Sequence, residues 1–248
     1  MRRLLVLVLL MSTLAACGSD EKPDKTTLTV FAAASLNGTF TEIGKQFEAK
    51  HDDVTVRFNF GGSADLVAQL GQGAPADVFA SADTANMDKA TAADLVAGEP
   101  RDFATNSLEI ATPPENPAAV RSLDDLSRAA LKVVLCAAEV PCGAVAHEVE
   151  RRSGIEIKPV SEEQSVTDVL GKVISGEADA GLVYVTDVKA SGDAVKGIGF
   201  PESSAAVNTY PIAIVKDTKT ADLAQAFVDF VTGSTGRGVL DAAGFGTP

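Results

Sequence analysis

The sequence LTVFAAASL occupies residues 28–36 and joins two different patterns. Its first part, residues 28–32, is a short and mostly apolar run, which predicts a buried strand. From residue 36 to residue 50 the apolar side chains instead follow helical spacing, which predicts a helix with one buried face. Ser35 therefore stands where a strand ends and a helix begins.

Outward from this segment the chain keeps alternating the two patterns. Further strands are predicted at residues 54–60 and in the run that ends at Ser81, and helices at residues 63–70 and from about Thr84. This order is typical of a parallel sheet covered by helices on both faces. A second series follows, with strands expected at 108–111, 133–136, up to Val160, 180–184 and 208–215, and helices at 143–152, 166–174 and 221–231.

The glycine-rich segment 233–238 lacks the spacing of a phosphate-binding loop. We interpret it as a turn that connects two helices.

The first sixteen residues predict an export signal rather than a part of the fold. Arg2 and Arg3 precede an apolar run, residues 4–11, that is too short to span a bilayer. The run leads to Leu-Ala-Ala-Cys17, which resembles the lipobox of bacterial lipoproteins, where the cysteine becomes the lipidated first residue. An ordinary cleavage site with an incidental cysteine is the alternative. Residues 17–25 are polar and predict a flexible tether, so we expect an exported protein that is lipid-anchored to the outer face of the cell membrane.

The charge balance narrows the classes of partner. The 248 residues include 34 acidic and 21 basic side chains, for a net charge of −13. Nucleic-acid binding normally needs a basic surface, so a nucleic-acid partner is excluded. Contact with an anionic membrane surface is disfavoured without a separate anchor. Two histidines and three cysteines leave few residues for a zinc site or a His-dependent enzyme.

Two cysteines remain beyond the lipobox. Cys136 and Cys142 flank a short proline-containing loop, and export would place them in an oxidising compartment. We predict a disulfide between them. The alternative is two separate thiols, because Cys136 also fits a buried strand position.

Four short segments place a small or hydroxyl residue where a strand ends and a helix begins. These segments are residues 33–36, 61–64, 140–143 and 164–167. In open α/β sheets ligands bind outside the carboxyl ends of strands, and a helix N-terminus there offers free N–H groups and partial positive charge. Singly, Ser35 and Ser63 are explained as helix caps. Together, the four junctions predict one shared anion site.

Several motifs, in conserved order along the chain after the tether, resemble bacterial periplasmic molybdate-binding proteins, the solute-binding lipoproteins of molybdate ABC importers. They are TVFAAASL at 29–36, GAPADVFASAD at 73–83, NSL at 106–108, GLVY at 181–184 and YPIA at 210–213. The resemblance implies an α/β, two-lobed periplasmic-binding-protein fold of type II, with the ligand cleft between the lobes. It also implies a monomer that is not an enzyme, uses no cofactor, and passes molybdate or tungstate to the membrane permease of an ABC importer.

The resemblance also sets the expected domain limits. Lobe one is expected at residues 26–105 plus 208–248, and lobe two at residues 106–207. The chain would then cross between the lobes twice, near Asn106-Ser107 and near Val207-Asn208.

Five residues carry over as the oxyanion site by their motifs. Ser35 and Ser63 would each give a hydroxyl and an N–H, Cys142 and Val166 a backbone N–H each, and Tyr184 its hydroxyl. These are seven donors with no Lys or Arg, which suits a fully deprotonated dianion, whereas protonated phosphate also needs an acceptor. The chain departs from the family in having Cys142 where alanine is common and Gly61-Gly62 where bulkier residues occur.

Three alternatives stay open at the level of sequence. Tyr184 also fits a core residue with a satisfied hydroxyl. A receptor for sulfate or another tetrahedral oxyanion would use similar donors, and tungstate is not separated from molybdate. An exported serine hydrolase using Ser35 or Ser63 is a different class, but neither serine lies in a Gly-x-Ser-x-Gly elbow.

Overall fold

The computed structural model describes residues 25–248. The predicted signal peptide (1–16), the predicted lipidation site Cys17 and all but the last residue of the predicted tether (17–25) lie outside the described residues. Within residues 25–248, no helix has the length and apolar character needed to cross a membrane.

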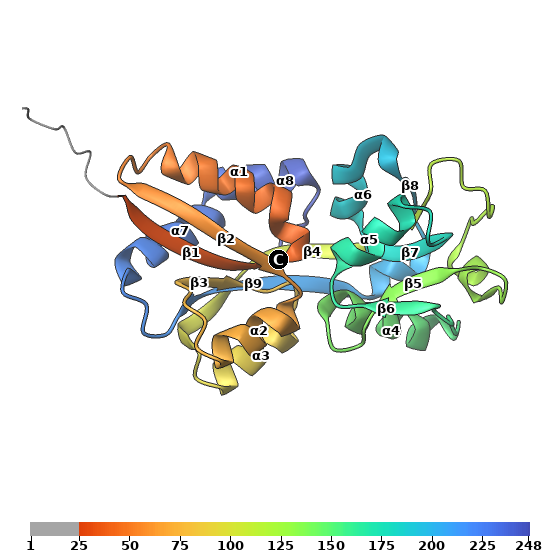
Figure 1. The fold of residues 1–248 in the computed structure, drawn as a ribbon, viewed down its shortest axis with the longest axis horizontal. Coiled ribbons are helices and arrows are strands. Elements are labelled where there is room, and N and C mark those ends of the chain that lie inside the picture. Colours follow the sequence, from red (N-terminus) through yellow and green to blue (C-terminus); the bar gives the residue numbers. More distant parts are fainter. Residues whose placement is uncertain (1–24) are drawn as a thin grey trace, which may run out of the picture.

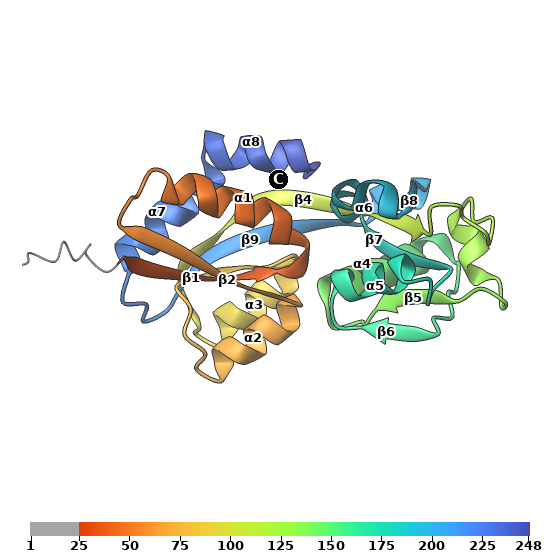
Figure 2. The same ribbon diagram turned by 45° about the horizontal axis from the view of Figure 1, so that its top comes forward.

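The first half of the molecule is built on a mixed sheet. Strands β1 (Thr26–Ala33), β2 (Val54–Gly61) and β3 (Val78–Ala80) are parallel, as the alternating pattern predicts. The sheet is not parallel throughout, because β9 (Val207–Val215) returns from the other half and pairs antiparallel with β3. Helices α1 and α8 lie on one side of these strands, and α2 and α3 on the other (Figure 2). The helices of this half are α1 (Asn37–Glu48), α2 (Ser63–Gly71), α3 (Thr84–Ala92), α7 (Ala221–Thr232) and α8 (Ser234–Ala243).

The second half has the same kind of architecture. Strand β5 (Val133–Cys136) pairs parallel with β6 (Ser161–Glu163) and β7 (Ala180–Tyr184), while β4 (Val96–Thr112) is antiparallel to β7 and to β8 (Lys196–Ile198). Its helices are α4 (Pro141–Ser153), α5 (Val166–Ile174) and α6 (Val185–Ser191). Four short 3₁₀ helices complete the described chain: η1 (Ala34–Leu36), η2 (Leu123–Ser127), η3 (Gly192–Ala194) and η4 (Pro201–Ala205).

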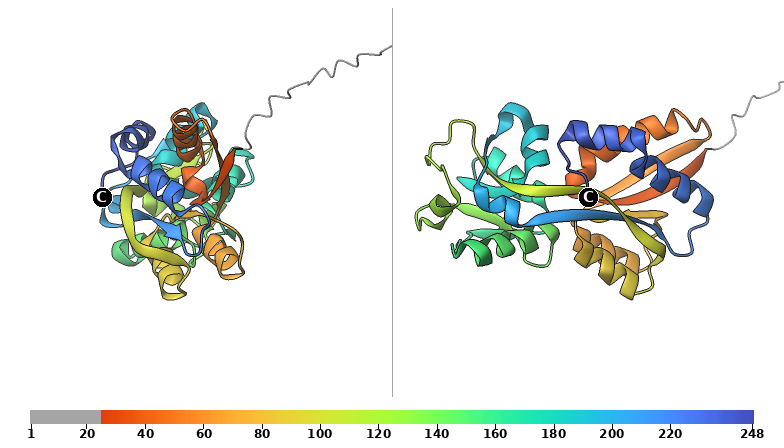
Figure 3. Two further views of the ribbon diagram at one scale, coloured as in Figure 1. Left: turned by 90° about the vertical axis from the view of Figure 1, so that its left-hand side faces the viewer. Right: turned by 180° about the vertical axis from the view of Figure 1, so that it is seen from behind.

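Two long strands, β4 and β9, run through both halves (Figures 1 and 3). β4 pairs with β9 as far as Ser107, opposite Val207, and from Leu108 onward it pairs with β7. The change of partner falls beside the two predicted crossings. Buried apolar side chains from residues 108–206 form one cluster, and those before and after form two others. The lobe limits themselves stay a prediction.

An aromatic cluster fills the core between α1, α7 and the first sheet. Phe40, Phe47 and Phe227 are fully buried. The ring of Phe227 lies edge-on to the other two, with centroids 5.2 Å from Phe47 and 6.3 Å from Phe40. Spacings of this kind favour aromatic pairs beyond the area they bury. The helical spacing of the apolar residues after Leu36 therefore serves to join α1 to α7.

The structure corrects three details of the sequence reading. The segment 233–238 is not a turn as a whole, because α8 begins at Ser234 and only Gly233 separates it from α7. A Cβ on Gly236 would lie 2.2 Å from the carbonyl oxygen of Val231, so the glycine lets α8 begin close to the end of α7. Val160 precedes β6 rather than ending a strand, and 61% of it is exposed. The first half of β4 was not predicted, because most of its residues before Phe103 are exposed and its register shifts twice.

Truncating the aromatic cluster is expected to destabilise the protein strongly. Phe227→Ala would remove a fully buried ring and leave a cavity, which costs about 3–5 kcal/mol of unfolding free energy. Val160→Ala, at an exposed position, should change it by no more than about 0.5 kcal/mol. Urea denaturation followed by circular dichroism measures both. Equal midpoints for the two variants would contradict the assignment of the core.

Candidate functional site

A small cavity lies where the two halves meet. All five residues of the predicted oxyanion site line it. The full lining consists of Ala33, Ala34, Ser35, Gly61, Gly62, Ser63, Ala82, Val140, Pro141, Cys142, Gln164, Ser165, Val166 and Tyr184. These residues include no Lys, Arg, His, Asp or Glu, so the lining carries no charged side chain.

The size of the cavity limits what it can hold. The centre of a water-sized sphere has about 20 Å³ in which to move. A single water needs roughly 10–15 Å³ by the same measure. The cavity in this closed arrangement therefore suits one compact ligand and not a sugar or a peptide.

Helix starts surround the cavity. η1 follows β1 directly, α2 begins at Ser63, α4 at Pro141 and α5 at Val166. N–H groups in the first turn of a helix have no acceptor in the same helix, and the N-terminus carries about half a positive charge. The residues that precede α2 and α4 provide no side-chain cap. The amides of Cys142 and Val166 thus belong to helix ends that can accept an anion.

The two serines do not cap helices, so that interpretation is wrong. Gly62 is the N-cap of α2, and the Oγ of Ser63 instead accepts a hydrogen bond from the backbone N–H of Ala82 at 3.1 Å. The Oγ of Ser35 lies 3.1 Å from the hydroxyl of Tyr210. Because the backbone of Ala82 already occupies a lone pair of Ser63, the Ser63 proton is free to donate elsewhere.

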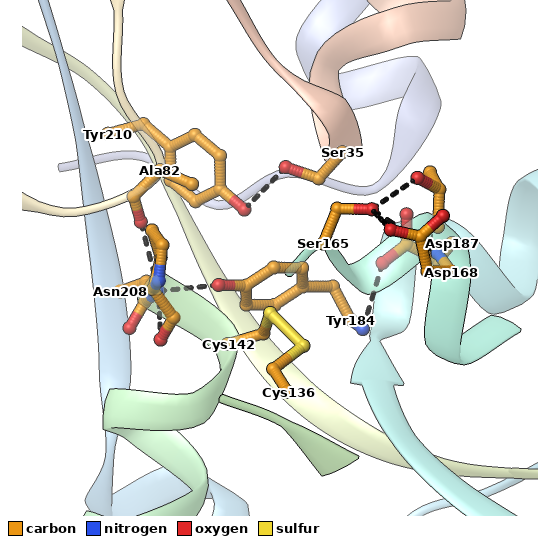
Figure 4. The surroundings of a disulfide bond; sticks show 12 residues. Ser35, Ala82, Cys136, Cys142, Ser165, Asp168, Tyr184, Asp187, Asn208 and Tyr210 are labelled. Atoms are coloured by element: carbon orange, nitrogen blue, oxygen red, sulfur yellow. Dashed lines mark hydrogen bonds between the residues drawn. A yellow bond between two sulfur atoms is a disulfide. The ribbon is translucent and has the colours of Figure 1, made fainter. Parts of the chain in front are cut away.

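Tyr184 is both a core residue and a lining residue. It is 1% exposed, and its hydroxyl oxygen lies 2.6 Å from Nδ2 of Asn208 (Figure 4). Burial, with smaller contributions from Tyr210 and Asp187, raises the pKa of Tyr184 well above its ordinary value. The phenol therefore keeps its proton throughout the physiological range and can act as a donor.

Asp187 lies directly behind Tyr184. Burial raises the pKa of its carboxyl group to about 7, although the hydrogen bond from the backbone N–H of Tyr184, at 3.0 Å, acts in the opposite direction. This bond also ties the start of α6 to the end of β7. Asp187 does not line the cavity.

Two further features of the site involve residues that lie in the predicted junctions but were given no role of their own. Ser165 lines the cavity and caps α5, accepting from the backbone N–H of Asp168. Gly62 contacts the other half, because a Cβ at this position would lie 2.2 Å from the carbonyl oxygen of Gln164. From the sequence, Gly61-Gly62 was only a departure from the family, in which bulkier residues occur here. The structure instead gives Gly62 a steric role in letting the halves approach.

Cys136 and Cys142 form a disulfide, with their Cα atoms 5.6 Å apart. The bond ties the end of β5 to the first turn of α4, where Cys142 lines the cavity. In residues 25–248 no group of three or more His, Cys, Asp or Glu side chains is arranged to hold a metal ion.

The chain belongs to the family of bacterial extracellular solute-binding proteins, whose model matches residues 28–246. Among individual relatives, it is 48% identical to the molybdate-binding protein ModA of Mycobacterium tuberculosis, over 98% of this chain and 97% of ModA.

Solved structures agree with the two-lobed fold. The periplasmic molybdate-binding protein of Azotobacter vinelandii superposes with a TM-score of 0.77 at 22% identity, covering 89% of this chain and 99% of that protein. The sulfate-binding protein SubI of Mycobacterium tuberculosis gives a TM-score of 0.76 at 18% identity, covering 89% and 86%. The near-equal scores mean that the fold alone does not distinguish the two ligands.

Loss of the disulfide is expected to destabilise the protein. Closing a short loop lowers the entropy of the unfolded chain, and for this spacing the effect is on the order of 2 kcal/mol. A reductant should therefore lower the urea midpoint of the wild type. It should leave unchanged the midpoint of a Cys136→Ala, Cys142→Ala double variant, which controls for other effects of the reductant. A wild-type midpoint that does not respond to complete reduction would contradict this role.

Proposed function

We propose that this protein binds molybdate, or the equivalent tungstate, and delivers it to the membrane permease of an ABC importer. The observation that carries the proposal is the cavity itself, which is lined by hydroxyl and amide groups and by no charged side chain. The ligand is held by the hydroxyl and N–H of Ser35 and of Ser63, the amides of Cys142 and Val166, and the hydroxyl of Tyr184.

A set of donors without cations fits a fully deprotonated tetrahedral dianion. Hydrogen bonds to a charged group contribute about 1.5–3 kcal/mol each, so seven give on the order of 10–20 kcal/mol before the costs of association. The helix starts around the cavity add favourable partial charge. Hydrogen phosphate would leave its own proton without an acceptor, and is expected to bind weakly.

Sulfate is also a dianion, so only size separates it from molybdate. Molybdate has longer bonds from the central atom to oxygen, and donors fixed on strand ends and helix starts cannot all follow a smaller ion inward. Each unmatched, desolvated donor costs about 1–3 kcal/mol. The 48% identity to a protein named for molybdate binding favours molybdate over the sulfate alternative.

The role is binding rather than catalysis. A serine hydrolase would need a general base next to its nucleophile. Ser35 has Tyr210 as its side-chain partner and Ser63 has the backbone of Ala82, and no His or carboxylate lines the cavity. We therefore assign the site no enzymatic activity and no cofactor.

The predicted leader places this receptor outside the cell. Residues 1–16 direct export, and acyl chains on Cys17 hold the protein at the outer face of the membrane, with 17–25 as the tether. The protein is a monomer made of two lobes. Lobe one is residues 26–105 with 208–248, and lobe two is residues 106–207. Because both lobes supply donors, the ligand favours their closed arrangement.

A calorimetric titration series tests the proposal. Molybdate and tungstate are expected to bind tightly, sulfate at least about a hundredfold more weakly because two donors are lost, and phosphate more weakly still. The same series with ester substrates in place of anions checks for hydrolysis. If sulfate displaced bound molybdate at equal concentration, the sulfate alternative would replace the proposal.

Gly62→Ala is expected to weaken molybdate binding by a factor of ten or more. The added methyl group would lie 2.2 Å from the carbonyl oxygen of Gln164 in the closed arrangement, so the lobes could not meet without moving that backbone. Gly71→Ala is the matched control, because a Cβ there has nothing within 4 Å. Calorimetry measures the molybdate affinity of both variants. Equal affinities would show that the contact at Gly62 does not limit closure.

A further inference from the structure

The buried side chain of Asn208 lies next to the cavity and contacts groups from both halves of the molecule. It lies at the start of β9, opposite Asn106 of β4, at the level where these strands pass between the halves, and it is 7% exposed. Its Nδ2 atom lies 2.6 Å from the hydroxyl oxygen of Tyr184, 2.9 Å from the carbonyl oxygen of Ala82 and 3.3 Å from that of Pro141 (Figure 4). Asn208 itself is not part of the cavity lining.

The two carbonyl groups fix which way the Asn208 amide points. A carbonyl oxygen only accepts hydrogen bonds, so the atom facing Ala82 and Pro141 must be the donor nitrogen. An amide nitrogen has no lone pair to offer, and the Tyr184 oxygen must therefore accept from it. The NH₂ group has two protons for three acceptors, so the longest contact, to Pro141 at 3.3 Å, shares a proton with one of the other two. The hydroxyl proton of Tyr184 is then left to point away from Asn208, toward either the hydroxyl of Tyr210 or a ligand in the cavity that Tyr184 lines.

The other two contacts reach donors of the site through the backbone. The carbonyl of Pro141 shares a peptide unit with the N–H of Cys142, and no described peptide bond is cis. In a trans peptide these groups point in opposite directions, so a bond from Asn208 to the carbonyl directs the Cys142 N–H away from Asn208. On the other side, Ala82 accepts from Asn208 through its carbonyl and donates to the Oγ of Ser63 through its N–H.

We infer that Asn208 is a positioning residue that orients three anion donors at once: the Tyr184 hydroxyl, the Cys142 amide and, through Ala82, the Ser63 hydroxyl. Ser63 belongs to one half of the molecule, and Tyr184 and Cys142 to the other. The same side chain thus links closure of the halves to the direction of the donors. This inference rests on the proposed oxyanion function and deepens it.

Asn208→Asp gives a test with a readout that a merely structural role would not move. An ionised carboxylate at this position would accept the Tyr184 proton, turning that hydroxyl away from the ligand, and would face two carbonyl oxygens. A protonated carboxyl group can donate to the Tyr184 oxygen again. Burial beside a bound dianion disfavours the charged form, so protonation falls within an accessible pH range.

The expected result is a pH-dependent loss of molybdate affinity, measured by calorimetry between about pH 6 and about pH 9. Relative to the wild type at the same pH, the variant should bind about 100-fold more weakly at the upper end and recover at least tenfold at the lower end. Asn116→Asp is the control, since Asn116 also donates to a backbone carbonyl but lies in a loop away from the cavity. The molybdate affinity of Asn116→Asp should equal that of the wild type at every pH.

Comparison with the wild type at each pH is needed because other ionisable groups face Tyr184 and Asn208. Asp187 on α6 lies behind Tyr184, and its pKa of about 7 falls inside the range. Asp83, at the start of α3, and Tyr210 on β9 also act on Tyr184. These groups are present in every protein compared, so the part of their titration that the substitution leaves unchanged cancels from the ratio.

A double-mutant cycle with Tyr184→Phe separates orientation from simple charge repulsion. Repulsion between the introduced carboxylate and the ligand lowers molybdate affinity by the same factor whether residue 184 is Tyr or Phe. If Asn208 acts through the Tyr184 hydroxyl, the loss at high pH should be at least about fivefold smaller in the Tyr184→Phe background. Equal losses in the two backgrounds, or a loss that does not vary with pH, would overturn the inference.

The experiment distinguishes failure of the proposed function from failure of this inference. If the wild type bound no molybdate, the proposed function would fail and this inference with it, whereas parallel pH curves with tight wild-type binding would remove the inference alone. If Asn208→Asp does not fold, ¹⁵N NMR of the wild type takes its place. We expect both side-chain amide protons of Asn208 to resist solvent exchange in the molybdate complex, and rapid exchange of either proton would overturn the inference.

Discussion

The constraint on which the site depends is the direction of a few hydroxyl protons. The oxygens of Ser63 and Tyr184 already accept hydrogen bonds, from the Ala82 backbone and from Asn208. Each hydroxyl thus has a proton left to give, and the helix starts beside them add free N–H groups. A cavity of this kind attracts a ligand that only accepts hydrogen bonds, and it needs no cation to do so.

This arrangement exists only when the two halves meet. Each half lines the cavity with residues from its own strand-to-helix junctions, and β4 joins the halves because it pairs first with β9 and then with β7. Gly62 permits the approach of one backbone to the other, and Asn208 touches groups from both sides. In the proposed function, ligand recognition and closure therefore depend on the same contacts.

Much of the fold could be predicted from the sequence, and the five residues that the family resemblance implies for the site all line one cavity. Short apolar runs and helical spacing place β5, β7 and α5 correctly, because those elements are buried in regular ways. The first half of β4 could not be predicted, since it is exposed and irregular there. Asn208 was placed near a crossing but its role was not foreseen. A polar side chain that starts an otherwise apolar strand was the available signal, and its partners come from three distant segments.

A crystal structure of the protein grown with molybdate, with the metal located by its anomalous scattering at the molybdenum edge, tests the central claim most directly. We predict one strong peak inside the cavity, with oxygens within hydrogen-bond distance of Ser35, Ser63 and Tyr184 and of the Cys142 and Val166 amides. Asn208 should stay bonded to Tyr184. A peak elsewhere, or a site in which a Lys or Arg side chain balances the ligand charge, would contradict the account.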